Sequence, residues 1–467
     1  MKPAAAFPQN HRKNTVPVAE TRTELAEDEW LSTVTKRSAV EDIHPIDDLV
    51  ASRRLLVDWY LIAEAAPPEL LRHYATFEEA DLTRRAAFDL ESMHRGDFSL
   101  RLAGTSDAVA ALLGVGARLR ALDDLLAIQA HDHGLPSDPE GTWLVKGSAD
   151  DAFLIPRYLP RKPPRARQGK PVTAGPFTHR SLIHHRVLPT RIGSRAVRLA
   201  CAAVRLGRDD GPLILGGGLF PGLHLIPEPV GKCFRIKAVQ CDRQEEVADE
   251  IMRQALVDDC CAVVFPELTI SPDLRNRIER SLRRQPPRPG RQRSIPLVIA
   301  GSWHEPAGAR YRNVAPILDG FGAVVARHEK TMPYDYNGSM EALQRGGAIT
   351  VVVTEDALVG VAICLDFCDR GGTRHNPYAM LDVDLMLVPS FGNARTLDGH
   401  MATAQDMKTR WRTETFVVQQ GDRLPPPGIG YVLAPADDLK SQATDLVSDQ
   451  PWNRRPASGT LDRAPSL

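Results

Sequence analysis

Apolar residues follow two different periods along this chain, and the change occurs near residue 233. In the first part, three stretches space their apolar residues three and four apart, which is typical of amphipathic helices. These stretches are 47–65, 78–94 and 106–131. Pro67 and Pro68 predict the end of the first one. We therefore expect a mainly helical region over 43–133, preceded by a polar arm over 1–42 that is predicted to be disordered.

After residue 233, short runs of Val, Ile and Leu alternate with polar or helical stretches. The main runs are CAVVF, IPLVIAG, VAPILDG, AVVARHEK, ITVVV, LVGVAICL and DLMLVPS. Near-continuous apolar runs of this length are typical of strands that are covered on both faces in layered α/β folds. The pattern predicts an α/β domain over 231–440, and a polar tail over 441–467 that is predicted to be disordered.

Residues 134–230 lie between these two regions and are rich in Pro, Gly and Arg. The run RYLPRKPPRARQGKP (157–171) is interpreted as an exposed basic loop, in preference to an arm that binds nucleic acid. The glycines 216–218 lack a surrounding strand, GxGxxG and helix, so they are interpreted as a turn without a phosphate. We expect a linker and a small irregular region here.

Charge and cysteine content exclude some classes of protein. The 467 residues include 58 Lys and Arg and 59 Asp and Glu, so the net charge is -1. This balance argues against nucleic-acid or membrane binding through bulk charge. The chain has no apolar signal segment and no apolar run of about 18 residues. Seven cysteines without a CxxC pair indicate a reduced protein, and we expect it in the cytoplasm.

Three reactive side chains follow buried strands. Glu267 comes after CAVVFP, Lys330 after AVVARHE, and Cys364 ends LVGVAI. Each residue alone has an ordinary structural interpretation, such as a buried cysteine or a surface lysine. Together they meet a chemical need, because a thiol with a pKa of about 8.5 requires a base to ionise and a cation to stabilise the charge that develops.

The same segments, in the same order, resemble the nitrilase superfamily of carbon–nitrogen hydrolases. VVFPEL is similar to the glutamate segment with Glu267, and YRNVAPILDGFGAVVARHEK to the segment that carries Asn313 and Lys330. SMEALQRGG is similar to the loop with a second glutamate, Glu341, and LVGVAICLDF to the nucleophile strand with Cys364. DLMLVPS, WRTETFVVQQ and GIGYVLAPAD resemble the strands and helix that follow. The resemblance is confined to the C-terminal half.

This resemblance implies an α/β fold of the αββα four-layer sandwich type, preceded by the mainly helical N-terminal region. It implies that Glu267 is the general base, that Cys364 attacks an amide or nitrile to form a thioester, and that Lys330 with the backbone N–H of Leu365 stabilises the oxyanion. Glu341 is expected to orient Lys330 or the substrate nitrogen. No metal or organic cofactor is expected.

The nucleophile motif departs from the usual pattern of the family. Asp366 keeps the acidic position, but the following Pro and Glu are absent and a glycine-containing loop replaces them. An Asp at this position is more similar to the amidase branches than to the nitrilases, so an amide substrate is favoured. Cys368 is interpreted as buried in preference to a resolving thiol. Tyr334, Tyr336 and Phe391 are candidates for lining the pocket, although such residues more often serve packing.

Two other functions remain open. The α/β region could be a catalytically silent binding or regulatory module, or a glutamine amidohydrolase that supplies ammonia to a separate partner. The complete Glu–Lys–Cys set argues against the first. By analogy with the family, a homo-oligomer through the nitrilase-like domain is expected, and the N-terminal region could bind an unknown protein partner.

Overall fold

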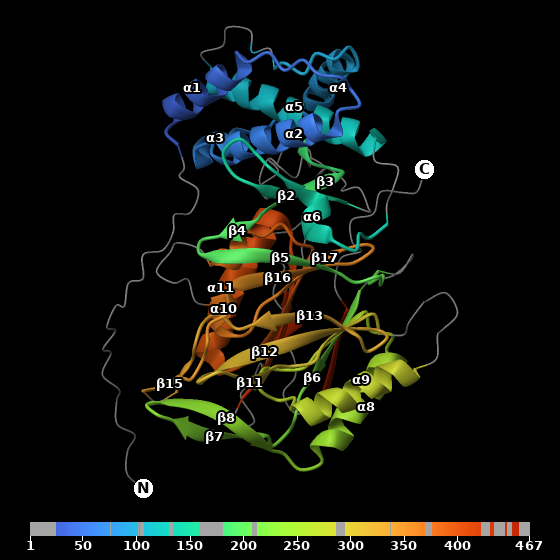
Figure 1. Cartoon of the computed structure of the whole chain (residues 1–467), viewed down its shortest axis with the longest axis vertical. Helices are drawn as coiled ribbons and strands as arrows, with labels where there is room; N and C mark the ends of the chain where they lie inside the picture. The colour runs from blue at the N-terminus through green and yellow to red at the C-terminus, as the bar shows by residue number, and fades with distance from the viewer. Residues whose placement is uncertain are drawn as a thin grey trace.

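The computed structural model places a group of helices at one end of the molecule and two large sheets at the other (Figure 1). The structure describes residues 25–74, 76–100, 102, 107–129, 134–157, 181–207, 213–285, 295–336, 338–368, 376–421, 430–433, 444–445 and 451–456. None of the helices within these ranges combines the length and the apolar character that crossing a membrane requires.

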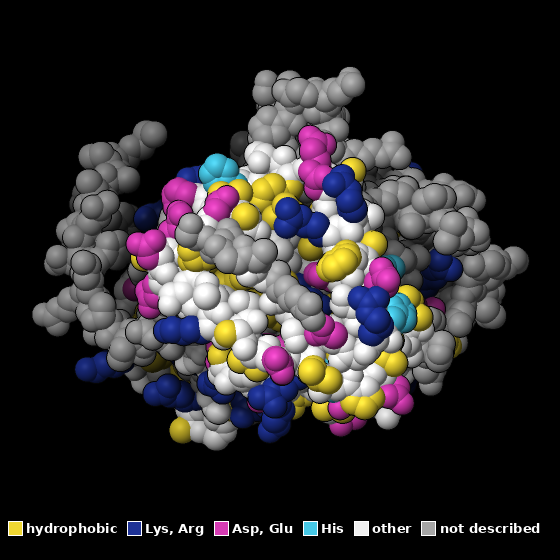
Figure 2. Space-filling view, turned by 90° about the horizontal axis from the view of Figure 1, so that it is seen from above, with side chains coloured by type: hydrophobic (Ala, Val, Ile, Leu, Met, Phe, Trp, Pro, Cys, Tyr) yellow, Lys and Arg dark blue, Asp and Glu magenta, His cyan; other side chains and the backbone are white. Residues whose placement is uncertain are grey.

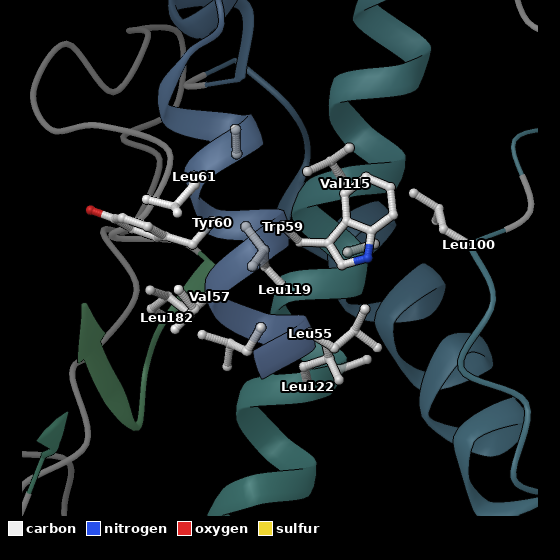
Figure 3. Packing of buried hydrophobic residues seen from close by; sticks show 14 of the residues in the cluster. Leu55, Val57, Trp59, Tyr60, Leu61, Leu100, Val115, Leu119, Leu122 and Leu182 are labelled. Atoms are coloured by element: carbon white, nitrogen blue, oxygen red, sulfur yellow. The ribbon is translucent and has the colours of Figure 1, made fainter. Parts of the chain in front are cut away.

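The helices of the N-terminal end pack around one central helix. They are α1 (Glu27–Ser38), α2 (Leu49–Glu64), α3 (Pro68–Tyr74), α4 (Glu79–His94) and α5 (Ala108–Gln129). Residues of α5 are buried around nearly all of its circumference, as is expected of a helix that its neighbours cover. Trp59 of α2 is buried beside Val115 of α5 and Leu100 (Figure 3). The Asp48 side chain caps α2 by accepting a hydrogen bond from the Ala51 N–H.

The predicted disordered arm over 1–42 is wrong where the structure describes it. Residues 27–38 form α1, which buries Trp30 and Val34, and the Trp30 indole donates a hydrogen bond to the Ile62 carbonyl at 2.8 Å. Only two residues of this helix are buried, so its apolar signal is too sparse for a periodic pattern. Residues 1–24 lie outside the described part of the chain.

A small sheet joins the helices to the rest of the molecule. This β2 sheet has the order β1 (Leu144–Val145), β2 (Ala152–Pro156) and β3 (His185–Pro189), and α6 (Pro139–Trp143) precedes it. Successive residues of β2 point to opposite faces. Leu154 therefore packs with the helices, while Phe153 and Ile155 pack with the large sheet that contains β18, which is described next. The expected linker over 134–230 thus contains strands, whereas the basic run after Arg157 lies outside the described residues.

Two large sheets form the other end. The β18 sheet has the order β21 (Thr444–Asp445), β20 (Gly430–Leu433), β19 (Glu414–Gln420), β18 (Leu385–Phe391), β17 (Leu358–Val361), β16 (Ala348–Val353), β5 (Arg195–Cys201) and β4 (Arg191–Ile192). The β9 sheet has the order β11 (Trp303–Ala307), β12 (Arg310–Asp319), β10 (Leu297–Ile299), β9 (Ala262–Val264), β6 (Ile214–Gly218) and β22 (Trp452–Pro456), and β13 (Val324–Glu329) pairs with β12.

The two large sheets share one apolar core, and helices cover their other faces. Val264 and Ile299 of the β9 sheet pack in the same cluster as Val361 and Leu387 of the β18 sheet. The opposite face of the β9 sheet packs against α8 (Gln244–Val257) and α9 (Pro272–Arg284). The opposite face of the β18 sheet packs against α11 (Ala394–Trp411), beside the short α10 (Leu365–Cys368) and η1 (Pro377–Met380). Burial on both faces explains the near-continuous apolar runs.

The turn predicted at glycines 216–218 is instead the buried strand β6. A Cβ atom at Gly216 would lie 2.2 Å from the Trp452 ring, and one at Gly218 would lie 2.9 Å from the Phe265 ring. Glycine is required here because aromatic rings approach the strand closely. Trp452 belongs to β22, which pairs antiparallel with β6, so the tail predicted to be disordered is ordered over 451–456.

A last sheet lies at the end of the molecule opposite the helices (Figure 1). This β8 sheet has the order β14 (Asp335–Tyr336), β15 (Ser339–Glu341), β8 (Cys233–Gln240) and β7 (His224–Val230). Its β7 and β8 strands form an antiparallel hairpin. Residues 195–230 thus add β5, β6 and β7 to the sheets, so the α/β region extends to residues before 231.

Candidate active site

The ends of strands from three sheets bring the predicted site residues together. Glu267 follows β9, Lys330 directly follows β13, and Glu341 is the last residue of β15. Cys364 lies between β17 and α10. All four side chains are buried. This placement agrees with the principle that reactive side chains collect at strand ends, where the strand fixes them and the next loop leaves space.

Lys330 lies between the two carboxylates. Its Nζ donates to Glu267 Oε1 at 2.7 Å and to Glu341 Oε2 at 2.9 Å. Asn313 of β12 bridges the same pair, because its Nδ2 donates to Glu267 Oε1 at 2.9 Å and to Glu341 Oε1 at 3.1 Å. These charge-assisted hydrogen bonds hold the ammonium group and both carboxylates in fixed positions.

Cys364 adopts a backbone conformation that non-glycine residues rarely occupy, with φ of 46°. Its N–H donates to the Pro389 carbonyl at 3.0 Å, which ties the turn to β18. Its Sγ lies 3.4 Å from the Phe391 carbonyl oxygen, and the charges of Glu267 and Lys330 both act on its thiol. A strained residue on a sharp turn from strand to helix is typical of a nucleophile that must be held at one orientation.

His304 completes the surroundings of Glu341, and the sequence analysis did not identify it. Its Nδ1 accepts a hydrogen bond from the Ile236 N–H at 2.8 Å, so the proton lies on Nε2, which contacts Glu341 Oε1 at 2.7 Å. The Tyr334 N–H donates to Glu341 Oε2 at 3.0 Å. The only sequence signal for His304 is a polar residue in a strand just before the lysine segment.

The surroundings of Glu267 favour a base that can accept a proton. Burial raises the pKa of Glu267, Lys330 opposes this increase, and the negative charge of Glu341 adds to it. Its Oε2 accepts a hydrogen bond from the Phe391 N–H at 3.1 Å. A carboxylate with a raised pKa is a stronger base than an exposed one, which suits proton transfer from a thiol.

The other two charged groups remain ionised. Burial alone would lower the pKa of Lys330, but Glu267 and Glu341 outweigh it and raise this pKa well above its usual value. Burial alone would raise the pKa of Glu341, but Lys330 and His304 outweigh it and hold this pKa far below its usual value. Lys330 is therefore a permanent cation next to the thiol.

Burial raises the pKa of the Cys364 thiol well above its usual value, and the charge of Glu267 adds to this while Lys330 opposes it. The sulfur is consequently protonated in the free protein. Nucleophilic attack must then be accompanied by transfer of the proton to a base. Glu267 is placed to receive it.

A cavity of about 370 Å³ borders the two glutamates and the lysine, whereas Cys364 is buried just behind its lining. Glu267, Lys330 and Glu341 line it, and so does Phe391, whose carbonyl oxygen contacts the Cys364 sulfur. Tyr334 also lines the cavity, whereas the side chain of Tyr336 lies outside the described part of the structure. The volume is in the lower part of the range of small-molecule sites.

Asp366 connects the nucleophile turn to the lysine segment. Its buried carboxylate accepts hydrogen bonds from the Thr331 N–H at 3.0 Å, the Thr331 hydroxyl at 2.7 Å and the Met332 N–H at 2.8 Å. Thr331 directly follows Lys330. The acidic residue two positions after the cysteine therefore fixes the backbone that carries the lysine.

Two further groups lie apart from this set. Cys368 is half-buried at the end of α10, so it is less buried than expected. In the helical end, Asp123, Asp124 and His184 lie close enough to hold a metal ion, as judged over the described residues. The Asp123 carboxylate already accepts hydrogen bonds from the Ile183 and His184 N–H groups, which indicates a structural role.

No protein-family model and no curated protein matches the sequence. Solved structures do resemble part of the chain. An amidase from Nesterenkonia sp. is 14% identical, with 54% of this chain and 94% of that chain covered and a TM-score of 0.38. Nit3 of Saccharomyces cerevisiae, a member of branch 10 of the nitrilase superfamily, is 15% identical over 55% of this chain and 93% of that chain, with a TM-score of 0.38.

At this identity and these TM-scores, the likeness identifies neither an activity nor a substrate. The roles of Glu267, Lys330, Glu341 and Cys364 therefore depend on the geometry of this chain's own site. The two solved structures that part of this chain resembles here, the Nesterenkonia amidase and Nit3, are both members of the nitrilase superfamily.

Proposed function

We propose that this protein is a hydrolase that cleaves a non-peptide C–N bond, in an amide in preference to a nitrile, through a thioester on Cys364. The observation that carries the proposal is the buried set of Glu267, Lys330 and Glu341, joined by hydrogen bonds of 2.7 and 2.9 Å, next to a cysteine with φ of 46°. A module that only binds has no need of a base, a cation and a thiol in one place.

In the first half of the reaction, the Cys364 sulfur attacks the amide carbonyl carbon while Glu267 takes the thiol proton. The carbonyl oxygen becomes an oxyanion, which Lys330 and the Leu365 N–H stabilise. Such a donor typically contributes roughly 10²–10³ in rate. The C–N bond then breaks, Glu267 returns the proton to the nitrogen, and ammonia or an amine leaves a thioester on the sulfur.

In the second half, Glu267 accepts a proton from a water molecule, and the hydroxide attacks the thioester carbonyl. The C–S bond breaks, the proton passes from Glu267 to the sulfur, and the carboxylic acid leaves. Glu341 holds Lys330 in place in both halves and takes no proton, because its pKa is far below its usual value. Asp366, the acidic residue of the nucleophile turn, supports an amide over a nitrile by resemblance to the amidase branches.

We also propose that the paired large sheets and their outer helices form the αββα four-layer sandwich of the nitrilase type. The shared core between the sheets and the helices on both outer faces support this assignment. All seven cysteines are free, which supports a reducing compartment such as the cytoplasm. A homo-oligomer and a protein partner for the N-terminal region remain predictions.

Replacing the nucleophile tests the proposal. Ammonia release from a panel of simple amides should fall to background in Cys364→Ala, because no other described side chain next to Glu267 can form the thioester. The matched control is Cys368→Ala, which removes a half-buried thiol four positions later and should retain activity. The thermal midpoint of both variants reports folding. Turnover by a folded Cys364→Ala protein would show that the assignment is wrong.

A further inference from the structure

We propose that the β7–β8 hairpin forms the specificity wall of the cavity, and that the substrate is an uncharged primary amide with an apolar acyl group. This inference rests on the proposed function and adds the substrate class. The hairpin supplies Leu225, Pro227, Phe234 and Ile236 to the cavity lining. Leu268, which directly follows the base Glu267, packs with Phe234 and Ile236.

The wall is attached to the catalytic groups by backbone contacts. β8 pairs in parallel with β15, and Phe234 lies opposite Glu341 in that register. The Ile236 N–H donates to His304 Nδ1 at 2.8 Å, and His304 Nε2 contacts Glu341 Oε1 at 2.7 Å. The apolar side chains therefore keep a fixed distance from the reacting centre, which is what discrimination between acyl groups requires.

Polar groups on the described lining have partners within the protein. Lys330 is the only cation among these lining residues, and two carboxylates already hold it. Asn393 accepts the Arg395 N–H with its side-chain oxygen at 3.0 Å, where it caps α11. A substrate carboxylate would enter a cavity that offers it no unpaired cation on these walls and that holds Glu341 as an anion. An unpaired charge in apolar surroundings is costly.

This lining distinguishes the hypothesis that the substrate is a simple amide from the hypothesis that it is glutamine. Glutamine carries an ammonium and a carboxylate a few bonds from its amide, so both would face the hairpin. Hexanamide carries a plain alkyl chain over the same distance. Each methylene buried against the wall should raise kcat/KM by roughly fourfold.

Matched substrates test the inference. We would measure kcat/KM by ammonia release for acetamide, hexanamide, L-glutamine and the monoamide of hexanedioic acid, which is hexanamide with a terminal carboxylate. Calorimetry with Cys364→Ala would measure Kd for the same four compounds. For hexanamide we expect a kcat/KM at least about tenfold higher and a Kd at least about tenfold lower than for acetamide. Relative to its carboxylated counterpart, we expect both quantities to favour hexanamide by at least about a hundredfold.

Hairpin variants locate the effect. Ile236→Ala should lower the ratio of hexanamide to acetamide kcat/KM by about tenfold, and the milder Ile236→Val, which keeps most of the buried volume, by about threefold. Ile226→Ala is the matched control, because Ile226 lies on the same hairpin, is 42% exposed and does not line the cavity. Its ratio should stay at the wild-type value.

The outcomes separate this inference from the proposed function. Cys364→Ala could bind the compounds in the expected order while the wild type releases no ammonia. The proposed role of the hairpin would then stand, and the proposed hydrolase activity would be wrong. If the wild type hydrolyses glutamine or the carboxylated amide as well as hexanamide, the hydrolase is correct and the wall is overturned. Equal ratios in Ile236→Ala and Ile226→Ala would also overturn the wall.

Discussion

Burial controls the chemistry of single residues in this site. The Cys364 thiol, Glu267 and Lys330 are almost inaccessible to solvent, so each would be neutral if it were alone. Their mutual contacts decide which proton moves. Lys330 stays charged because two carboxylates surround it, whereas the thiol stays protonated. This state makes Glu267 the group whose ionisation limits the reaction at low pH.

The raised pKa of Glu267 predicts the acid limb of the pH profile. The base must be ionised to accept the thiol proton, so kcat/KM should fall as the pH decreases through a value above 4.5, the usual pKa of such a carboxyl. The charge of Glu341 is one cause of the increase. Glu341→Gln removes that charge and should move the limb to lower pH, in addition to lowering the rate.

The control for this experiment is Glu329→Gln. Glu329 directly precedes Lys330, but its carboxylate forms an ion pair with Arg312 at 3.1 Å and does not contact Glu267. Its acid limb should match that of the wild type. Profiles of kcat/KM between pH 3 and 9 on one amide provide the comparison. A limb that moves to higher pH in Glu341→Gln would contradict the coupling between the two carboxylates.

At the scale of elements, the site depends on how the nucleophile turn and the lysine segment are held together. These segments come from different large sheets, since β17 lies in the β18 sheet and β13 pairs into the β9 sheet. Asp366 joins them because its carboxylate accepts hydrogen bonds from three donors, which are the Thr331 N–H, the Thr331 hydroxyl and the Met332 N–H. Loss of this connection should let Lys330 and Cys364 move relative to each other.

Asp366→Asn tests that connection. The amide keeps the shape of the carboxylate but loses its negative charge, and an NH2 group replaces the oxygen that also accepts from the Thr331 N–H at 3.2 Å. The hydrogen bonds to the remaining oxygen therefore weaken, because they are no longer assisted by charge. We expect kcat to fall by roughly 10–100-fold, because displacements of about 1 Å have effects of this size. Asp398→Asn on the exposed face of α11 is the matched control and should keep the wild-type kcat. Equal kcat in both variants would remove Asp366 from the account.

The strand ends that carry Glu267 and Cys364 were predictable because β9 and β17 are buried throughout and give unbroken apolar runs. The expectation of a buried strand before Lys330 is wrong, because β13 is largely half-buried or exposed. β8 was also predictable as a strand, but its position in a separate sheet with β7, β14 and β15 was not. Phe234 and Ile236 are buried while the residues between and after them are more exposed, and such alternation is typical of an antiparallel strand with one open face. That pattern indicates a sheet outside the main core.

Other features leave no local trace in the sequence. β6 consists largely of glycine because Trp452 and Phe265 approach its backbone, and Trp452 is more than 200 positions away from it in the sequence. His304 lies in an ordinary edge strand, and only the folded chain brings it to Glu341. Contacts between residues distant in the sequence cannot be inferred from periodicity, so these parts required the structure.

At the scale of the whole molecule, the β2 sheet connects the helical end to the β18 sheet by more than apolar packing. Arg157, which directly follows β2, and Arg186 of β3 are buried beside Asp382, which precedes β18. Arg157 lies 2.9 Å from the Asp382 carboxylate, and Arg186 also pairs with Asp384. Buried guanidinium groups require such carboxylates, because an unpaired buried charge is strongly unfavourable.

Asp382→Ala should therefore destabilise the protein by about 3–5 kcal/mol, since Arg157 would lose its carboxylate partner in a buried position. Urea unfolding followed by circular dichroism gives the free energy of unfolding. Asp81→Ala is the control, because its ion pair with Arg84 is exposed and should contribute less than about 1 kcal/mol. Similar losses in the two variants would contradict a connection that depends on this buried cluster.

Helices α1 to α5 lie at the end of the molecule opposite the β7–β8 hairpin (Figure 1). None of their described residues lines the cavity. Seen from above, acidic and basic side chains are interspersed with hydrophobic ones on this end (Figure 2). The described side chains on this face therefore carry charges of both signs. The helical end therefore contacts the α/β region through the β2 sheet and not at the cavity.

The mass of the covalent intermediate shows most directly whether Cys364 is the nucleophile. The protein would be mixed with a slowly hydrolysed amide, quenched in acid and analysed as intact protein and as peptides. We expect one acyl group, attached to Cys364, that appears before the acid product and is absent in Cys364→Ala. An acyl group on Cys368 would contradict this assignment. Steady turnover by Cys364→Ala, with no adduct on that variant, would also contradict it.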